Sequence, residues 1–385
     1  MENKKLQQLA EDSTSRVESN NYMYYWQCDN YKFDNRSLSK WYELATGKWS
    51  TFIFSKYDKV KKVLSDGLLD MNRDYQAEYV AQLRDQYDYI QLFFSGGYDS
   101  NTVLDQFVQQ GIVVDETLSL IVGRSIDQPG NQEIKNLALP ALSKYSKYIK
   151  KQTILKNDYQ TLTDWFKDEY RFFVMPGDSV VPYGLGRLGN TVQHREVLPN
   201  SCYIKCHDKP QLVYYKNRWY AYCLDVTING DTDIPNMLWF WYEPDNIKSY
   251  IQQSRKYRDY ILQSTKVESK LGFYKTDQDR YINTHVLGRT PIVDETKMLR
   301  KDISGKKLMS KHVQRMQDII ADGEYQLLTN YFACQKIYNQ IFDANQSQHV
   351  LDGNANSKFA WFIDIDSLEM FTQNELIPDG FDPSW

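Results

Sequence analysis

The chain has 385 residues, of which 42% are hydrophobic and 25% charged. This globular composition excludes collagen-like, coiled-coil and wholly disordered proteins, and at about 150 residues per domain the length predicts two to three domains. The 46 Lys and Arg residues against 50 Asp and Glu give a net charge of −4. That balance excludes a general basic field for duplex nucleic acid, although it leaves room for a local basic patch.

Three features predict a cytoplasmic protein with no membrane partner. The chain begins MENKK, without the apolar stretch of a signal peptide. Its densest apolar run, MLWFWY at 237–242, is far shorter than the roughly 20 residues that a membrane-spanning helix needs. The five cysteines are odd in number and scattered, which is typical of a reducing compartment.

The first 74 residues form a predicted N-terminal segment that is rich in aromatic side chains. Residues 1–20 are polar, and we expect them either to fray or to form one short helix. Residues 22–58 are irregular, with strand-like pieces at 22–27 and 51–55.

Alternating helices and strands follow in the predicted central domain, 75–228. The predicted elements are a helix over 75–88, a buried strand over 89–94, a helix from Ser100 to near Gly111, a strand over 117–122, a helix over 131–145 and a strand over 148–155. The helices are predicted from apolar residues spaced three or four apart, and the strands from short apolar runs. Because strands that alternate with helices are typical of a parallel sheet, we expect an α/β fold.

Beyond about residue 170 the pattern changes. Residues 175–200 are rich in Gly and Pro and predict loops, whereas 211–228 predicts a hairpin with its turn at 216–218. From about Asn246 the spacing of apolar residues is mostly helical, so we expect a mainly helical C-terminal region over 229–385.

The stretch LFFSGGYDS at 92–100 carries the clearest chemistry. A buried strand leads into a glycine turn that opens a helix, so that backbone N–H groups and the helix dipole converge on one concavity. With the hydroxyls of Ser95 and Ser100, this makes a site suited to phosphate. Asp99 repels a bare phosphate, and its presence therefore indicates a bridging Mg²⁺. The Walker A sequence G-x-x-x-x-G-K-[ST] is absent.

The sequence SGGYDS at 95–100 resembles the SGGxDS motif of the PP-loop superfamily, the N-type ATP pyrophosphatases. This superfamily includes the synthetase domain of asparagine synthetases, argininosuccinate and GMP synthetases, and tRNA-thiolating enzymes. The clear match covers about 88–125, and the succession of strands extends it to about 170. The overall layout is also similar to phage-encoded PP-loop proteins described as asparagine synthetase-like.

The resemblance implies a reaction and two cofactors, ATP and Mg²⁺. Family members cleave ATP between the α and β phosphates, adenylate a substrate oxygen and release pyrophosphate. Ammonia or another nucleophile then displaces AMP. The expected substrate is a small molecule with a carboxylate or carbonyl oxygen.

The resemblance also assigns roles to residues of this chain. It places pyrophosphate on Ser95, Gly96, Gly97, Tyr98, Asp99 and Ser100, Mg²⁺ on Asp99, and adenine on the backbone of Leu120, Val122 and Gly123. A lysine from a later segment usually approaches the phosphates, and here the candidates are Lys205 and Lys209. The alternative is that both are exposed turn lysines.

One departure from the asparagine synthetases concerns the source of ammonia. Their glutamine-dependent members begin with a catalytic cysteine after Met1, whereas here residue 2 is Glu and the first cysteine is Cys28. Only about 90 residues precede the loop, too few for a glutaminase domain of the usual size. We therefore expect the nucleophile to be free or to come from a partner.

Weaker motifs lie further along the chain. The sequence GLGRLG at 184–189 matches G-x-G-x-x-G but lacks the flanking strand and helix of a dinucleotide site, so a substrate loop is favoured. Arg187 and Arg195 there suit an acidic substrate, or are simply solvated. Cys202, Cys206 and His207 lack the second ligand pair of a zinc site.

Two alternatives to a small-molecule synthetase remain open on the sequence. In the first, a PP-loop enzyme modifies tRNA or DNA bases, with the basic stretch Lys297–Arg315 as its nucleic-acid surface. Such a stretch is more often a solvated helix face or a flexible arm. In the second, the chain binds adenine nucleotide without turnover.

Overall fold

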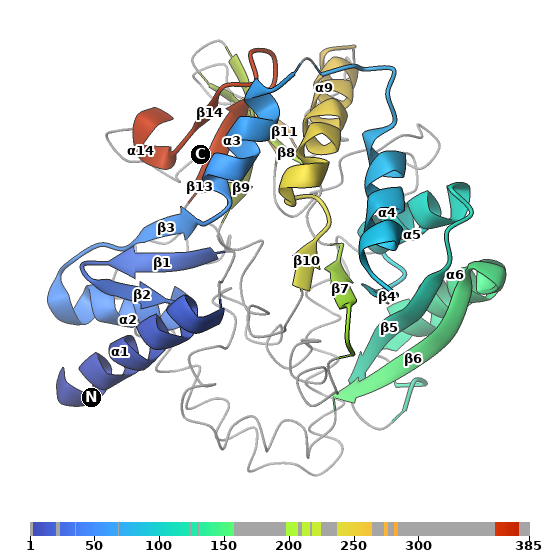
Figure 1. Ribbon diagram of the computed structural model, residues 1–385, viewed down its shortest axis with the longest axis horizontal. Coiled ribbons are helices and arrows are strands. Elements are labelled where there is room, and N and C mark those ends of the chain that lie inside the picture. Colours follow the sequence, from blue (N-terminus) through green and yellow to red (C-terminus); the bar gives the residue numbers. More distant parts are fainter. Residues whose placement is uncertain are drawn as a thin grey trace.

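The computed structural model describes residues 3–20, 24–34, 36–67, 69–122, 125–128, 131–157, 198–206, 210–215, 218–224, 237–263, 273–275, 281–283 and 359–376. Three β-sheets lie in this part of the chain: an N-terminal sheet of three strands, a central sheet of five and a third sheet of six. Figure 1 shows the N-terminal sheet and the five-stranded sheet on opposite sides of the molecule, with the six-stranded sheet above them.

The five-stranded sheet is entirely parallel, as the alternation of helices and strands predicts. Its strands are β4 (Tyr89–Phe93), β5 (Val114–Val122), β6 (Ile149–Asn157), β7 (Ser201–Lys205) and β10 (Met237–Trp239). Their order across the sheet is β10-β7-β4-β5-β6, and every neighbouring pair is parallel. The chain is thus an α/β protein.

Helices connect these strands close to the predicted positions. They are α4 (Tyr75–Gln86), α5 (Tyr98–Gln109), the π-helical turn η2 (Ile134–Ala138), α6 (Leu139–Lys144) and the short η3 (Ser146–Tyr148). Two details differ from the prediction. Helix α5 begins at Tyr98 rather than Ser100, and the helix predicted over 131–145 contains the π-turn. Pro140 has no N–H to donate to the preceding turn, and the wide turn lies immediately before it.

The N-terminal segment is more ordered than its polar sequence predicts. It contains α1 (Asn3–Asn20), β1 (Tyr24–Cys28), β2 (Tyr31–Phe33), α2 (Arg36–Thr46), β3 (Thr51–Phe54) and α3 (Tyr57–Ser65). Helix α1 is anchored on β2 because the buried Asp34 accepts hydrogen bonds from Ser13 Oγ at 2.7 Å and Arg16 Nε at 2.9 Å. A buried carboxylate satisfied in this way fixes the helix on the sheet.

The third sheet is antiparallel and combines the predicted hairpin with strands from the C-terminal region. It contains β8 (Gln211–Tyr215), β9 (Arg218–Leu224), β11 (Phe273–Lys275), β12 (Tyr281–Asn283), β13 (Phe359–Asp364) and β14 (Met370–Phe371). The strand order is β11-β12-β8-β9-β13-β14. The hairpin is confirmed. Beyond 228, α9 (Ile247–Gln263) and α14 (Gln373–Leu376) are helical, whereas β10 joins the parallel sheet and β13 pairs with β9.

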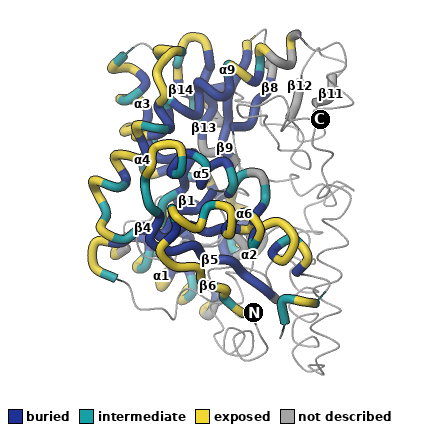
Figure 2. Tube along the Cα trace, turned by 90° about the vertical axis from the view of Figure 1, so that its right-hand side faces the viewer, coloured by how far each residue is buried: buried dark blue, intermediate teal, exposed yellow. Residues whose placement is uncertain are grey.

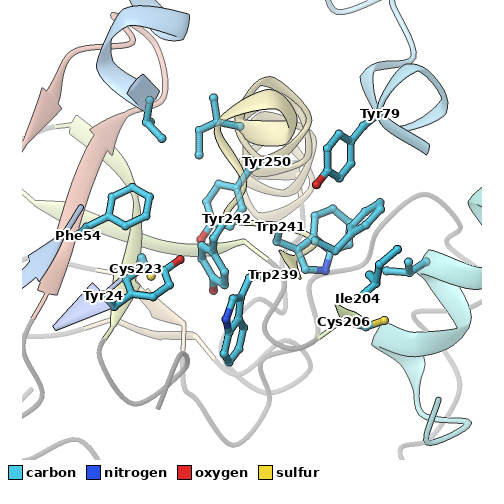
Figure 3. Packing of buried hydrophobic residues seen from close by; sticks show 14 of the residues in the cluster. Tyr24, Phe54, Tyr79, Ile204, Cys206, Cys223, Trp239, Trp241, Tyr242 and Tyr250 are labelled. Carbon is cyan, nitrogen blue, oxygen red and sulfur yellow. The ribbon is translucent and has the colours of Figure 1, made fainter. Parts of the chain in front are cut away.

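One hydrophobic cluster runs through the three sheets, and its largest fully buried side chains are aromatic. Figure 2 shows the strands as the buried interior and the helices as partly exposed layers around them. Figure 3 shows Trp239, Trp241, Tyr242 and Tyr250 gathered close to helix α9. A partly buried ion pair also joins the N-terminal and central regions: Lys56 Nζ, just before α3, lies 2.6 Å from a carboxylate oxygen of Glu243.

Candidate functional site

The loop after β4 lies where the direction of strand addition reverses. From β4 the chain adds β5 and then β6 on one side, and later adds β7 and β10 on the other. In open parallel sheets, ligands bind beyond the carboxyl ends of the strands at such a reversal. Here the reversal lies between β4 and β7, so the loop at 94–97 and Cys206, directly after β7, lie at the same edge of the sheet.

Position 96 accommodates only glycine, because of its backbone conformation and because of the atoms that lie next to it. Its φ is +76°, in the left-handed region that favours glycine. A Cβ added there would lie 2.3 Å from the backbone nitrogen of Ala138 and 2.5 Å from its Cα. The π-helical turn η2 therefore packs directly on the loop, and no side chain fits between them.

The serines of the motif brace the loop. Ser95 is exposed, and its Oγ accepts a hydrogen bond from the N–H of Gly97 at 3.2 Å. Ser100 is buried, and its Oγ donates to the carbonyl of Gly97 at 3.2 Å while lying 3.4 Å from Ser95 Oγ. The two predicted phosphate ligands are thus brought together at the start of α5.

Helix α5 begins at the same loop. Gly97 is the N-cap and Tyr98 the first helical residue, with Asp99 in the first turn. By geometry, the first N–H groups of a helix have no intrahelical acceptors, and they carry the positive end of the helix dipole. The backbone therefore offers donors to an anion at this end of β4.

Two further residues hold the loop, and sequence analysis missed both. The side-chain amide of Asn101 donates to the carbonyl of Gly96 at 2.6 Å and to that of Gly97 at 3.0 Å. Ser119 Oγ, on β5, donates to the carbonyl of Phe94 at 2.7 Å. The sequence signal for Asn101 is its place one residue after Ser100, where a polar side chain lies one turn from the glycines. Ser119 gave no such signal because its partner depends on strand pairing.

Two carboxylates border the loop. Asp99 is half-buried. A carboxylate oxygen of Glu133, which immediately precedes η2, would lie 3.3 Å from a Cβ placed on Gly97. Glu133 is thus a second carboxylate beside the loop, in addition to Asp99, which was expected to bind Mg²⁺. Mg²⁺ in phosphate sites is usually held by one or two carboxylates together with phosphate oxygens and water.

Lys205 and Cys206 lie beside the loop at the end of β7. Strand β7 pairs with β4, with Ile204 opposite Leu92, so Lys205 lies level with the last residue of β4. Cys206 Sγ lies 3.6 Å from the carbonyl oxygen of Phe93. Burial raises the pKa of the Cys206 thiol well above its usual value, and the charge of Asp99 raises it further.

Lys205 is not an exposed turn lysine, because only 4% of its surface is accessible. Its Nζ lies 4.1 Å from the centroid of the Trp239 ring. Lys residues are rarely so buried unless their charge is compensated. Of the two lysines proposed from sequence, Lys205 therefore stands at the loop, and Lys209 lies outside the described residues.

The remaining predicted residues are placed only in part. Leu120 is buried on β5, and Val122 is the last residue of that strand. Tyr98 is placed by its backbone as the first residue of α5. The predictions for Gly123, Arg187, Arg195 and the stretch Lys297–Arg315 fall outside the described residues.

A protein-only metal cage is not found in the described part of the chain. No group of three or more His, Cys, Asp and Glu side chains could hold a metal ion there. Cys202 and Cys206 are buried free thiols, and burial raises the pKa of Cys202 to about 12. They are core residues, in line with the preferred interpretation of the sequence. Among the described helices, none is both long and apolar enough to cross a bilayer.

A shallow depression lies at the opposite, amino-terminal edge of the parallel sheet. Its two cations are already paired, because the buried Asp115 accepts a hydrogen bond from Arg84 at 2.6 Å and from Lys150 at 2.7 Å. The lining residues are Arg84, Tyr87, Asp88, Gly111, Ile112, Val113 and Lys150. The charged side chains at this edge of the sheet therefore form an ion-pair network around Asp115.

Comparison with known proteins adds no assignment: no family model, curated protein or solved structure matches the chain.

Proposed function

We propose that this chain is an ATP pyrophosphatase of the PP-loop type. It would cleave ATP between the α and β phosphates, transfer AMP to a substrate oxygen and release pyrophosphate. Ammonia or another nucleophile would then attack the substrate atom that carries this oxygen, and AMP would leave with the oxygen. The observation that carries the proposal is the position of the SGGYDS loop, at the carboxyl end of β4 and at the reversal of strand order. There the N-terminus of α5, two serine hydroxyls and a buried lysine come together at the carboxyl ends of two neighbouring strands.

The residues present suit a pyrophosphate group. Ser95 is exposed and lies within reach of an anion at the N-terminus of α5. A Cβ on Gly97 would lie 3.1 Å from Ser95 Oγ and 3.3 Å from a carboxylate oxygen of Glu133, so glycine leaves room there between two polar side-chain ends. Lys205 supplies a positive charge from the neighbouring strand. In such a site, positioning and charge stabilisation provide most of the catalysis.

The same residues suit Mg²⁺ bound together with nucleotide. Asp99 and Glu133 border the loop, and phosphate oxygens and water would complete the coordination shell. When bound, the metal would neutralise charge on the phosphates. The acceptor that we propose is a small molecule with a carboxylate or carbonyl oxygen, as the resemblance implies.

The test is to identify the nucleotide products. The protein is incubated with Mg²⁺ and ATP in the presence of either the small-molecule or the macromolecular fraction of a cell extract. AMP and pyrophosphate formed with the small-molecule fraction support the proposal. The same products with the macromolecular fraction indicate a nucleic-acid or protein acceptor. ADP and phosphate, or ATP binding without turnover, would overturn it.

A matched pair of variants ties the products to the loop. Asp99→Asn should lower AMP formation about a hundredfold or more, the usual effect of removing one charge-stabilising group from a site. Asp105→Asn, a change of the same kind later in helix α5, should leave the rate within about twofold because it lies outside the first turn. Equal rates for both variants would remove Asp99 from the site.

A further inference from the structure

We propose that Trp239 is a positioning residue that holds the Lys205 ammonium at the carboxyl edge of the parallel sheet, facing the pyrophosphate of bound nucleotide. The proposal rests on the proposed function, which supplies the anion. It adds a residue that lies far from the motif in sequence and carries no motif of its own.

The geometry of the pair is the first argument. Lys205 Nζ lies 4.1 Å from the centroid of the Trp239 ring, within the distance of a cation–π contact. Both residues are almost fully buried, at 4% and 3% exposure. Trp is the aromatic side chain that binds a cation best, and the contact strengthens when the cation is removed from water. The ring therefore offers the ammonium a defined place.

The backbone fixes both residues, which is the second argument. Lys205 and Trp239 are register partners in the parallel pairing of β7 with β10. The N–H of Phe240 then donates to the carbonyl of Lys205 at 3.0 Å, extending that pairing. The ring and the ammonium are thus carried by two adjacent strands of a rigid sheet, where a site is placed more accurately than on loops.

A buried carboxylate also holds the backbone of Trp239. The backbone N–H of Trp239 donates to Glu243 Oε1 at 3.2 Å, and Glu243 Oε2 lies 2.6 Å from Lys56 Nζ. Burial raises the pKa of Glu243, and the charge of Lys56 opposes that rise. The positioning of Trp239 therefore depends on an ion pair that reaches back to the start of α3.

The side of the sheet on which Lys205 lies also fits the role. Side chains alternate along a strand, so Lys205 shares its face with Tyr203. Tyr203 stacks on Phe93 of β4 with ring centroids 5.8 Å apart, and Leu118 of β5 completes this small cluster. Lys205 thus stands beyond an apolar layer, next to the point where β4 turns into the loop. Water competes least with an ion contact in such surroundings.

A double-mutant cycle tests whether Trp239 acts through Lys205. Binding of inorganic pyrophosphate with Mg²⁺ is measured by calorimetry for the unmodified protein, Trp239→Leu, Lys205→Met and the double variant. Trp239→Leu should weaken binding about fivefold, and Trp239→Phe, which keeps an aromatic face, about twofold. In the Lys205→Met background, Trp239→Leu should change the affinity less than about twofold, because its partner is already absent.

The control is Trp241→Leu, which removes another fully buried Trp two residues away. It should lower stability without weakening pyrophosphate binding. Two results overturn the inference: an equal loss of affinity from Trp239→Leu with and without Lys205, which indicates a purely structural role, or an equal loss from Trp241→Leu. Absence of pyrophosphate binding by the unmodified protein overturns it as well.

The role of Trp239 and the proposed function can be refuted independently of one another. AMP formation by the unmodified protein tests the proposed function and does not involve Trp239. Pyrophosphate binding with a coupled cycle but no AMP would overturn the enzyme and keep the pair as an anion clamp. AMP formation with an additive cycle would keep the enzyme and remove Trp239 from its site.

Discussion

Replacing Gly96 by Ala tests the close approach of η2 to the loop. Two separable penalties arise. The first is conformational, because φ is +76°, and an L-residue in the left-handed region costs about 1–2 kcal/mol. The second is steric, because the new Cβ would lie 2.3 Å from the backbone nitrogen of Ala138. Overpacking of this kind typically costs about 1–3 kcal/mol. The expected loss of unfolding free energy is therefore about 2–5 kcal/mol.

Two other glycines provide the control. Gly47 and Gly111 have φ of +72° and +68°, and nothing lies within 4 Å of a Cβ added to either. Their Ala variants carry the conformational penalty alone, about 1–2 kcal/mol. The assay is urea denaturation of the three variants and the unmodified protein, followed by circular dichroism.

The reasoning is refuted if Gly96→Ala and the control variants lose the same unfolding free energy. If Gly96→Ala loses no more stability than Gly111→Ala, η2 does not press on the loop as described. If it does lose more, pyrophosphate affinity should fall as well, because the loop must shift away from η2 to accept the methyl group.

Three further predictions concern the loop and the opposite edge of the sheet. Gly97→Ala should change stability by less than about 1 kcal/mol, because its nearest neighbours are movable side-chain ends, yet weaken pyrophosphate binding about tenfold because the methyl group would displace Ser95 Oγ and the Glu133 carboxylate beside the proposed phosphate site; calorimetry checks this, and unaltered affinity would contradict the site. Asn101→Ala should lower the unfolding free energy by about 1–2 kcal/mol, because two loop carbonyls lose their donor; urea denaturation measures it, and no loss would exclude the bracing role. Burial alone would raise the pKa of Asp115, but hydrogen bonds from Lys150, the Ile90 N–H and Arg84 outweigh it and lower the pKa below 3.8. Its stabilisation is therefore present above about pH 4 and lost as pH falls through the lowered pKa, so Asp115→Asn should flatten the acid limb of a stability–pH curve; an unchanged acid limb would refute this.

Local patterns predicted most of the central elements. The apolar run at 89–94 contains β4, and the hairpin after Gln211 is present as predicted. Tyr75, Tyr79 and Leu83, spaced four residues apart, lie on α4. These predictions succeed because helix and strand periodicity depends on residues only a few positions apart. The N-terminal helix was underestimated because its apolar face is narrow, and its docking depends on Asp34, which lies on another element.

In the candidate site, too, local features could be predicted from the sequence and long-range contacts could not. The sequence alone identified SGGYDS and therefore an anion site with a carboxylate, because the chemistry of a glycine turn at a helix N-terminus is local. It proposed Lys205 together with Lys209 and gave no reason to choose between them. The position of Asn101 directly after Ser100 was a signal that the sequence predictions did not use, whereas the sequence offered no sign of the π-turn pressed on Gly96 or of Trp239.

Those features were decided by the tertiary structure alone. Strand order placed β7 beside β4 and set Lys205 next to the loop, and parallel pairing with β10 set Trp239 under its ammonium. The physical reason is that strand order and close packing are properties of the whole core, which brings together groups far apart in the chain. The sequence predicted a glycine turn at 95–100 that is suited to phosphate, and the fold determined which side chains surround it.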